Sequence, residues 1–334
     1  MSEILIISKA DFELTTNSVC DWLNHYGVPF IRLNVDRIAD PLYYEVFINL
    51  NGHELEIFDK VNSRKIDLKK IKVVWCRRFI DMVYEQVVTQ EKEIDGNVIR
   101  FAKFHAAERN RFLRILYDFY PEWKWFDYYK DSLKIDKIEV LRLAKKHGLT
   151  IPETYIANSR ESLRKISDLK KNLITKPIFE GVTFSDSRGM YGTHTQPVKK
   201  CEIDVFTPSL FQENILKKFE LRIFYLSGKF YPMAIFSSKS SRTRTDFRNY
   251  DIFNPNRCVP YHLPQAIKES LTDLMNDLHL SSGSIDMIKH VDGRYIFLEV
   301  NPVGQFGMVS QPCNYYLEKE VAEFLIQQKE KEYA

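Results

Sequence analysis

Apolar and polar positions follow two different periods along the chain, and the N-terminal part shows both. Residues 4–7 form a short apolar run typical of a buried strand. Residues 15–26 place apolar side chains at helical spacing and end at Gly27, a common helix terminator. A second apolar strand at residues 30–33 completes a β-α-β opening. This order predicts an open α/β sheet at the N-terminus.

The pattern then changes to a hairpin, a strand and a long helix. Apolar and polar residues alternate on both sides of Asn51-Gly52, which predicts a hairpin, and residues 71–78 are typical of another strand. Residues 97–119 predict a long amphipathic helix. Basic and aromatic residues are interleaved over residues 109–130, which would suit a nucleic-acid or peptide surface. We interpret them instead as part of the amphipathic helix followed by a packed linker at 121–130.

The second half of the chain mixes helices and strands before it becomes mainly strand-like. The predicted elements are helices at 132–147, 159–169 and 314–330 and strands at 153–157 and 172–176. A glycine-rich stretch follows at 180–194, and mainly strand and hairpin patterns lead from it to the last helix. We therefore expect an α/β (α+β) protein in three parts. These are an N-terminal open-sheet domain (1–120), a small central α/β domain (121–205) and a C-terminal antiparallel-sheet domain (206–334).

Composition narrows the class of protein. The chain has 48 basic and 45 acidic residues, a net charge of +3, and the two signs are finely mixed, which is not typical of a nucleic-acid binder. Its five cysteines are scattered without a CxxC pair, which argues against a disulfide framework or a structural zinc site. The apolar runs are too short for a signal peptide or a membrane span. We expect a cytoplasmic protein with no nucleic-acid or membrane partner.

The clearest chemical signal lies in the hairpin around Asp292-Gly293. A two-residue turn there places Asp286 directly opposite Glu299, with Asn301 two residues further along on the same face. Opposed carboxylates repel each other, so a cation between them is one explanation, and Mg²⁺ prefers such oxygen ligands. The alternative is that one carboxylate pairs with a lysine or an arginine. The added amide of Asn301 favours the metal.

Three other segments carry candidate chemistry. Glu220 and Arg222 share one face of a strand, which suits ribose hydroxyls and phosphate oxygens but also an ordinary ion pair. Lys176 ends a strand before the glycine-rich stretch, where it is either a phosphate ligand or a solvated lysine. That stretch lacks the Walker pattern, so a P-loop fold is not supported. The charged run 243–251 contains Arg248, either a loop residue in solvent or a donor to a negatively charged transition state.

These segments and their order resemble the ATP-grasp superfamily, and within it the microviridin-type or grasp-with-spasm graspetide synthetases, which macrocyclise ribosomal precursor peptides. The resemblance covers most of the chain. Residues 136–159 look like the family segment that opens the ATP-binding region. Residues 73–78 are similar to a motif of the N-terminal domain, with Cys76 where an aromatic residue is more usual.

The resemblance implies ATP and Mg²⁺ as cofactors and assigns roles to particular residues. The implied roles are contacts to ATP phosphates (Lys137, Lys176), the adenine-binding hinge (Gln212, Glu213, Asn214, Ile215), the ribose ligand (Glu220), arginines near the γ-phosphate and the activated carboxylate (Arg222, Arg248), and Mg²⁺ ligands (Asp286, Glu299, Asn301). The implied fold is the ATP-grasp fold, with the nucleotide between the central and C-terminal domains.

The implied activity is that of an ATP-dependent, ADP-forming ligase. Asp or Glu side chains of a precursor peptide, with a leader and a core rich in Thr, Asp and Glu, become acyl-phosphates. Thr or Ser hydroxyls then attack and form ω-esters. Two alternatives remain: an ATP-grasp amide ligase that adds amino acids to a protein or metabolite, and a non-catalytic nucleotide-gated peptide-binding module. The sequence leaves open the peptide, the ring number, ester or amide linkage, the leader-docking surface and the oligomeric state, with a homodimer among the options.

Overall fold

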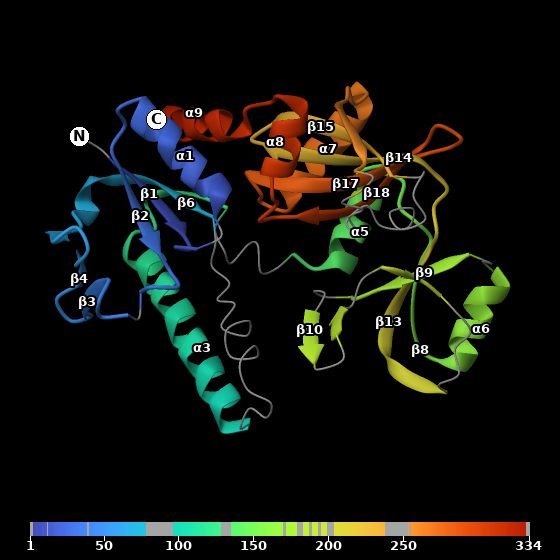
Figure 1. The fold of residues 1–334 in the computed structure, drawn as a ribbon, viewed down its shortest axis with the longest axis horizontal. Coiled ribbons are helices and arrows are strands. Elements are labelled where there is room, and N and C mark those ends of the chain that lie inside the picture. The colour runs from blue at the N-terminus through green and yellow to red at the C-terminus, as the bar shows by residue number, and fades with distance from the viewer. Residues whose placement is uncertain are drawn as a thin grey trace. The chain divides into compact units, whose positions relative to one another are not determined.

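Two compact units make up the chain, which is shown in Figure 1 as a computed structural model. Unit 1 comprises Met1–Lys130 and Tyr316–Ala334, and unit 2 comprises Asp131–Tyr315. The described residues are 3–11, 13–38, 40–77, 96–127, 135–169, 172–178, 183–186, 189–192, 195–198, 204–237, 253 and 255–331. The last helix thus belongs to the same unit as the N-terminus, whereas the expected boundary between residues 205 and 206 lies inside unit 2 and stays a prediction.

Unit 1 is built on a four-stranded parallel sheet in the order β2-β1-β6-β7. Its strands are β1 (Glu3–Ser8), β2 (Phe30–Asn34), β6 (Ile71–Cys76) and β7 (Lys124–Phe126). The central strand β1 is apolar and almost fully buried, because helices cover both faces of a parallel sheet. The predicted β-α-β opening is confirmed. Strand β7 lies inside the segment interpreted as a linker, and its three residues are too few to show a period.

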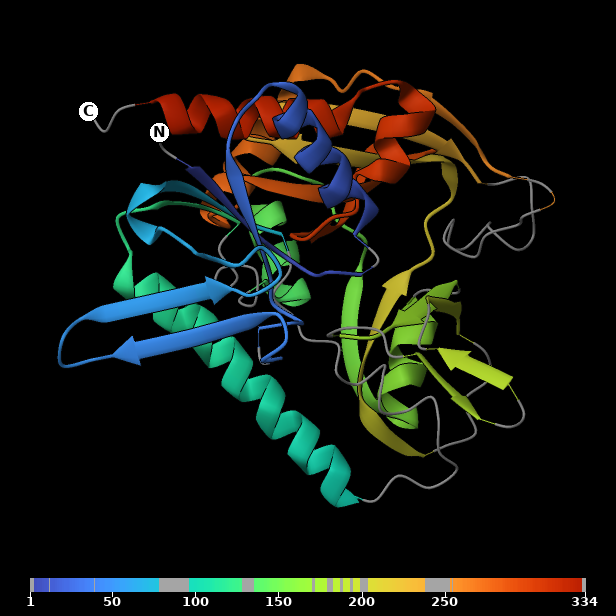
Figure 2. The ribbon, with the colours of Figure 1, turned by 60° about the vertical axis from the view of Figure 1, so that its left-hand side comes forward.

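Helices and a small sheet complete unit 1. The helix α1 (Leu14–His25) packs beside α9 (Leu317–Glu330), which also contacts β1 and β6 (Figure 1). On the other face, α3 (Gly96–Phe119) contributes its C-terminal half to the core. The predicted hairpin is confirmed as β3 (Tyr44–Asn49) and β4 (Glu54–Asp59), with the short β5 (Arg64–Lys65) and the 3-10 helix η1 (Leu68–Lys70) following. Figure 2 shows this hairpin beside α3, where the ring of His53 stacks on Phe119 with centroids 4.6 Å apart.

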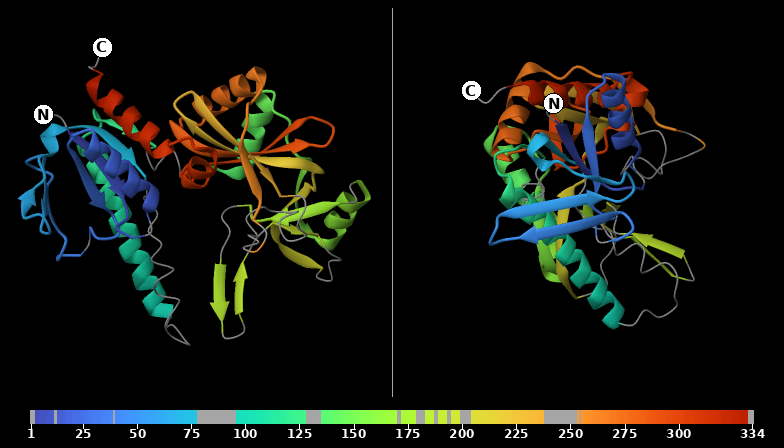
Figure 3. Two further views of the ribbon diagram at one scale, coloured as in Figure 1. Left: turned by 45° about the horizontal axis from the view of Figure 1, so that its top comes forward. Right: turned by 90° about the vertical axis from the view of Figure 1, so that its left-hand side faces the viewer.

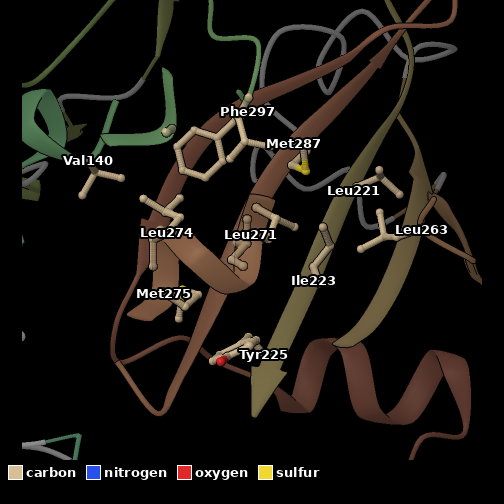
Figure 4. Close-up of a cluster of buried hydrophobic side chains, with 14 of the residues drawn as sticks. Val140, Leu221, Ile223, Tyr225, Leu263, Leu271, Leu274, Met275, Met287 and Phe297 are labelled. Carbon is tan, nitrogen blue, oxygen red and sulfur yellow. The ribbon is translucent and has the colours of Figure 1, made fainter. Parts of the chain in front are cut away.

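Unit 2 contains a five-stranded antiparallel sheet in the order β16-β15-β14-β17-β18 (Figure 3). Its strands are β14 (Lys217–Leu226), β15 (Lys229–Phe236), β16 (Arg257–Pro260), β17 (Ser282–His290) and β18 (Tyr295–Asn301). The helices α5 (Lys137–Lys146) and α7 (Gln265–Asp277) supply side chains to the core on one face, where Leu271 and Leu274 pack with Ile223 (Figure 4). The helix α8 (Gly307–Cys313) contacts β14, β15 and β16.

The helix α7 corrects the expectation that this part of the chain is mainly strand and hairpin. Its buried residues Leu271, Leu274, Met275 and the following Leu278 repeat every three to four positions. That spacing is the helical period, so the signal was present in the sequence. It was obscured because the flanking segments are strands.

A second, smaller sheet of unit 2 has the order β12-β9-β13-β8. Its elements are β8 (Thr154–Ser159), β9 (Leu173–Lys176), β12 (Gln196–Pro197) and β13 (Val205–Glu213), with α6 (Arg160–Leu169) packed against them. Within the glycine-rich stretch, β10 (Thr183–Asp186) and β11 (Gly189–Gly192) form a hairpin. Residues 214–216 connect β13 directly to β14 of the five-stranded sheet. Among the described residues, no helix is long and apolar enough to cross a membrane.

Candidate nucleotide and metal site

Three charged residues form a row across neighbouring strands of the five-stranded sheet. Asp286 on β17 lies directly opposite Glu299 on β18, as predicted, and opposite Arg222 on β14 on its other side. The predicted two-residue turn is wrong, because the amide of His290 bonds to the carbonyl of Arg294 and leaves a three-residue loop. A bulge between Asp286 and Met287 shifts the register back by one residue. The two offsets cancel, so the carboxylates still meet.

Asp286 and Arg222 are a buried ion pair. The Nη1 atom of Arg222 donates to Oδ2 of Asp286 at 2.7 Å, and both residues are 6% exposed. Glu220, Arg222 and Phe224 alternate with core residues of β14 and are buried on the opposite face of the sheet. Glu220 and Arg222 therefore share one face of the strand, as predicted, and the side chain of Arg222 is directed toward Asp286.

Glu299, the third member of the row, lies between two lysines from other elements. The Nζ atoms of Lys176 and Lys137 lie 3.9 and 4.0 Å from its Oε2. Lys137 is the first residue of α5, held there because the carboxylate of Asp136 caps the helix by accepting from two backbone amides. Its Nζ also donates to the carbonyl oxygen of Pro177, which follows Lys176. Two lysines far apart in sequence thus converge on one carboxylate.

These contacts change the expectation of mutual repulsion between Asp286 and Glu299. Cationic side chains lie beside both carboxylates, so the alternative of pairing with an arginine or lysine holds for Asp286. The three charged residues of the row and the two lysines beside Glu299 together carry a net charge of +1. This charge suits a polyanionic ligand such as a triphosphate. Lys176 has a side chain only 9% exposed, so it is not a solvated strand-end lysine.

The oxygen ligands of the row fit Mg²⁺ when phosphate oxygens complete its coordination. Asn301 lies two residues beyond Glu299 on β18, opposite Ser284. Mg²⁺ commonly uses one or two carboxylates together with phosphates and water. Within the described parts of the chain, no group of three or more His, Cys, Asp and Glu side chains could hold a metal ion by itself.

The residues predicted to form the adenine hinge lie where the two sheets of unit 2 join. Gln212 and Glu213 end β13, and Ile215 belongs to the connection to β14. Gln212 is 1% exposed, and its Nε2 donates to the hydroxyl of Thr154 at 2.9 Å. The amide of Glu213 bonds to the carbonyl of Glu153 at 3.0 Å. These bonds hold the end of β13 against β8, which fixes the start of the connection.

Glu220 has two buried partners that the sequence reasoning did not identify. Lys217 donates to Oε1 of Glu220 at 2.5 Å, and the hydroxyl of Ser237 donates to the same oxygen at 2.6 Å. The spacing of Lys217 and Glu220 is visible in the sequence. Ser237 directly follows β15, and only the pairing of β14 with β15 brings it to Glu220.

Thiol chemistry is not favoured in this part of unit 2. Burial, and to a smaller extent the nearby Cys258, raises the pKa of Cys313 to about 11. Burial also raises the pKa of Cys258. Both thiols stay protonated at neutral pH, so neither is poised as a nucleophile. Arg248 and the rest of the charged run 243–251 lie outside the described residues, so the prediction for Arg248 is carried by the resemblance.

Comparisons with known proteins concern the fold of the chain as a whole. No family model matches the chain, and no curated protein does. Among solved structures, the macrocyclase MdnC from Microcystis aeruginosa MRC, bound with the precursor peptide MdnA, matches with a TM-score of 0.78 and 25% identity, over 97% of this chain and 99% of that one. The RiPP-associated ATP-grasp ligase of Chryseobacterium gregarium, in complex with ADP and a leader and core peptide, matches with a TM-score of 0.78 and 23% identity over 100% of both chains.

A third similar structure is the macrocyclase MdnB from Microcystis aeruginosa MRC, with a TM-score of 0.74 and 23% identity over 98% of this chain and 99% of that one. These matches span nearly the whole length of each protein, so the resemblance to ATP-grasp ligases is confirmed for the fold and not for a fragment of it. The chain has the fold of the ATP-grasp ligases, in the form shared by the macrocyclases MdnC and MdnB and the RiPP-associated ligase.

Proposed function

We propose that this protein uses ATP and Mg²⁺ to close rings in a ribosomal precursor peptide. It would convert an Asp or Glu side chain of the peptide into an acyl-phosphate, which a Thr or Ser hydroxyl of the same peptide attacks to give an ω-ester. ADP and inorganic phosphate are the other products. The observation that carries the proposal is the row Arg222, Asp286 and Glu299 with Lys137 and Lys176 beside it.

The fit of the row to Mg²⁺-ATP follows from its chemistry. Lys137 and Lys176 would bind phosphate oxygens, and the connection after Gln212 and Glu213, which includes Ile215, would hold adenine by its backbone. Asp286, Glu299 and Asn301 would hold Mg²⁺, which supplies charge neutralisation at the β- and γ-phosphates when bound. In phosphoryl transfer the protein contributes mainly positioning and electrostatic stabilisation, so two lysines that converge beside the row are suited to the task.

The two arginines would act at the reacting carboxylate. Arg222 lies in the row beside Asp286 and would stabilise negative charge as the peptide carboxylate approaches the γ-phosphate. We assign Arg248 to the oxyanion or the departing phosphate on the resemblance alone. Activation is needed because a free carboxylate is a poor electrophile, and ester formation in water is unfavourable.

The peptide partner is proposed from the similar structures. MdnC is bound with the precursor peptide MdnA, and the Chryseobacterium ligase is in complex with a leader and core peptide. We propose the same kind of partner here, with a leader and a core rich in Thr, Asp and Glu. The proposed location is the cytoplasm, where ATP is available.

Product analysis tests the proposal and separates it from the two alternatives. The protein is incubated with ATP, Mg²⁺ and a candidate precursor peptide that has a leader and a core rich in Thr, Asp and Glu, and peptide mass and nucleotide products are measured. We expect the loss of one water and the formation of one ADP for each ring. AMP and pyrophosphate would indicate adenylation and contradict the mechanism. ADP release with free amino acids would favour an amide ligase, and no ADP release with any substrate would favour a binding module.

A further inference from the structure

Glu220, Lys217 and Ser237 form a buried polar cluster next to the connection between the two sheets of unit 2. The side chains of Lys217 and Glu220 are 5% and 9% exposed, and Ser237 is fully buried. Lys217 is the first residue of β14, directly after residues 214–216. The cluster therefore lies where the predicted adenine hinge meets the face that carries Arg222.

Two donors converge on a single oxygen of Glu220. Lys217 and Ser237 both donate to Oε1, at 2.5 and 2.6 Å. A carboxylate held by two donors at one oxygen has its plane fixed by the protein. Lys217 also places an opposite charge directly beside the buried carboxylate.

Burying this ion pair costs free energy of folding, so stability alone does not explain why Lys217 and Glu220 are buried together. Two charges removed from water lose solvation that their mutual attraction only partly restores, and well-packed apolar residues often do as well. The next residue, Lys218, is exposed to solvent, so its charge stays hydrated and loses no solvation free energy. The contrast between adjacent lysines argues that Lys217 is buried for the sake of Glu220.

We propose that Lys217 and Ser237 are positioning residues that hold the carboxylate of Glu220 for the ribose hydroxyls of the bound nucleotide. This inference rests on the proposed function, in which Glu220 is the ribose ligand. Lys217 and Ser237 hold the carboxylate through Oε1, and the carboxylate held in this way accepts hydrogen bonds from the ribose hydroxyls. Neither Lys217 nor Ser237 needs to touch the nucleotide.

The test compares the affinities of the full chain for ATP and for 2′,3′-dideoxy-ATP, both with Mg²⁺, by calorimetry. We expect the parent to bind ATP about 10-fold more tightly, because hydrogen bonds to a charged group are the strong kind. In Ser237→Ala, ATP affinity should fall about 2–10-fold while dideoxy-ATP affinity changes little. Ser237→Thr keeps the hydroxyl and should restore the preference for ATP. Lys217→Met should reduce that preference further, and Lys218→Met is the matched control that should retain it.

The outcomes separate this inference from the proposed function. If the parent binds ATP but does not prefer it to dideoxy-ATP, Glu220 does not read the ribose and the inference is wrong. It is equally wrong if Ser237→Ala weakens both nucleotides by the same factor, because that is the signature of a merely structural role. A parent that binds neither nucleotide would contradict the proposed function itself. Ser237→Ala removes no charge, so it keeps the test informative even if Lys217→Met fails to fold.

Discussion

The two faces of the five-stranded sheet are built from alternating residues of the same strands, yet they bury different chemistry. On one face Leu221 and Ile223 of β14 pack against α5 and α7 in an apolar core (Figure 4). On the other, Glu220 and Arg222 are also buried but are held by ion pairs and hydrogen bonds. The apolar face gains stability from burial alone, whereas every charge on the polar face must have a partner. The comparison distinguishes residues that stabilise the fold from residues that we propose bind a ligand.

The largest effect is expected on the polar face, from Asp286→Asn. ADP formation should be lost, because a proposed metal ligand is gone. The free energy of unfolding should also fall by about 3–5 kcal/mol, because the guanidinium of Arg222 is left buried without its partner. Urea unfolding and ADP release measure the two effects.

A second substitution sharpens this prediction. In Arg222→Met/Asp286→Asn the unpaired buried charge is absent, so part of the lost stability should return while activity stays absent. A single variant Asp286→Asn that is as stable as the parent would mean that the carboxylate was relieved of repulsion instead. That result would support the explanation given from the sequence alone, in which Asp286 and Glu299 repel each other unless a cation lies between them.

On the apolar face, Leu271→Ala should lower the free energy of unfolding by about 2–5 kcal/mol. Leu271 is fully buried between α7 and the sheet, so the loss comes from buried surface and a cavity. ATP affinity, measured by calorimetry well below the melting temperature, should stay within about 2-fold of the parent. A large loss of ATP affinity in the folded variant would contradict the claim that the apolar face serves the fold and the polar face serves the ligand.

Lys176→Ala should act on the nucleotide more than on the fold. Lys137 remains beside Glu299, so the carboxylate keeps a cationic neighbour. ATP affinity should fall about 10–100-fold, the scale of one charge-assisted contact, and peptide binding should persist. Lys165→Ala, on the exposed surface of α6, is the matched control. Unchanged ATP affinity in folded Lys176→Ala would remove this lysine from the phosphate site.

The smallest effect on stability is expected from Asp277, on the solvent-exposed side of α7. Hydrogen bonds from Lys146 and then His147 lower the pKa of Asp277 below its ordinary value. A lowered folded-state pKa adds stability above the ordinary carboxyl range and loses it as the pH falls through the folded value. Asp277→Asn should therefore melt slightly below the parent at neutral pH and level with it in strong acid. A difference that grew in acid would have the wrong sign.

Much of the fold and part of the site could be predicted because their signals are local. The pattern of apolar residues located β1, α1, β2 and the long α3. The opposition of Asp286 and Glu299 was also predicted, but from a turn of the wrong length, because the three-residue loop and the bulge offset each other. The pairing of Asp286 with Arg222 could not be predicted, because β14 and β17 are separated by α7 and the register between them is non-local.

The same limit applies to the lysines around Glu299. Lys137 begins a helix and Lys176 ends a strand of another sheet, and only the tertiary fold brings both to β18. The sequence therefore identified the individual members of the candidate site. It did not show which of them lie beside one another.

The most direct test of the account is a crystal structure of the protein with Mg²⁺ and a non-hydrolysable ATP analogue. We expect Lys137 and Lys176 to contact phosphate oxygens, and oxygens of Asp286, Glu299 and Asn301 to lie about 2.0–2.1 Å from one or two Mg²⁺ ions. Arg222 should keep to the same face of the sheet, directed toward the γ-phosphate. A nucleotide bound elsewhere, or one bound here while Asp286 and Glu299 stay away from the metal, would contradict the central claim.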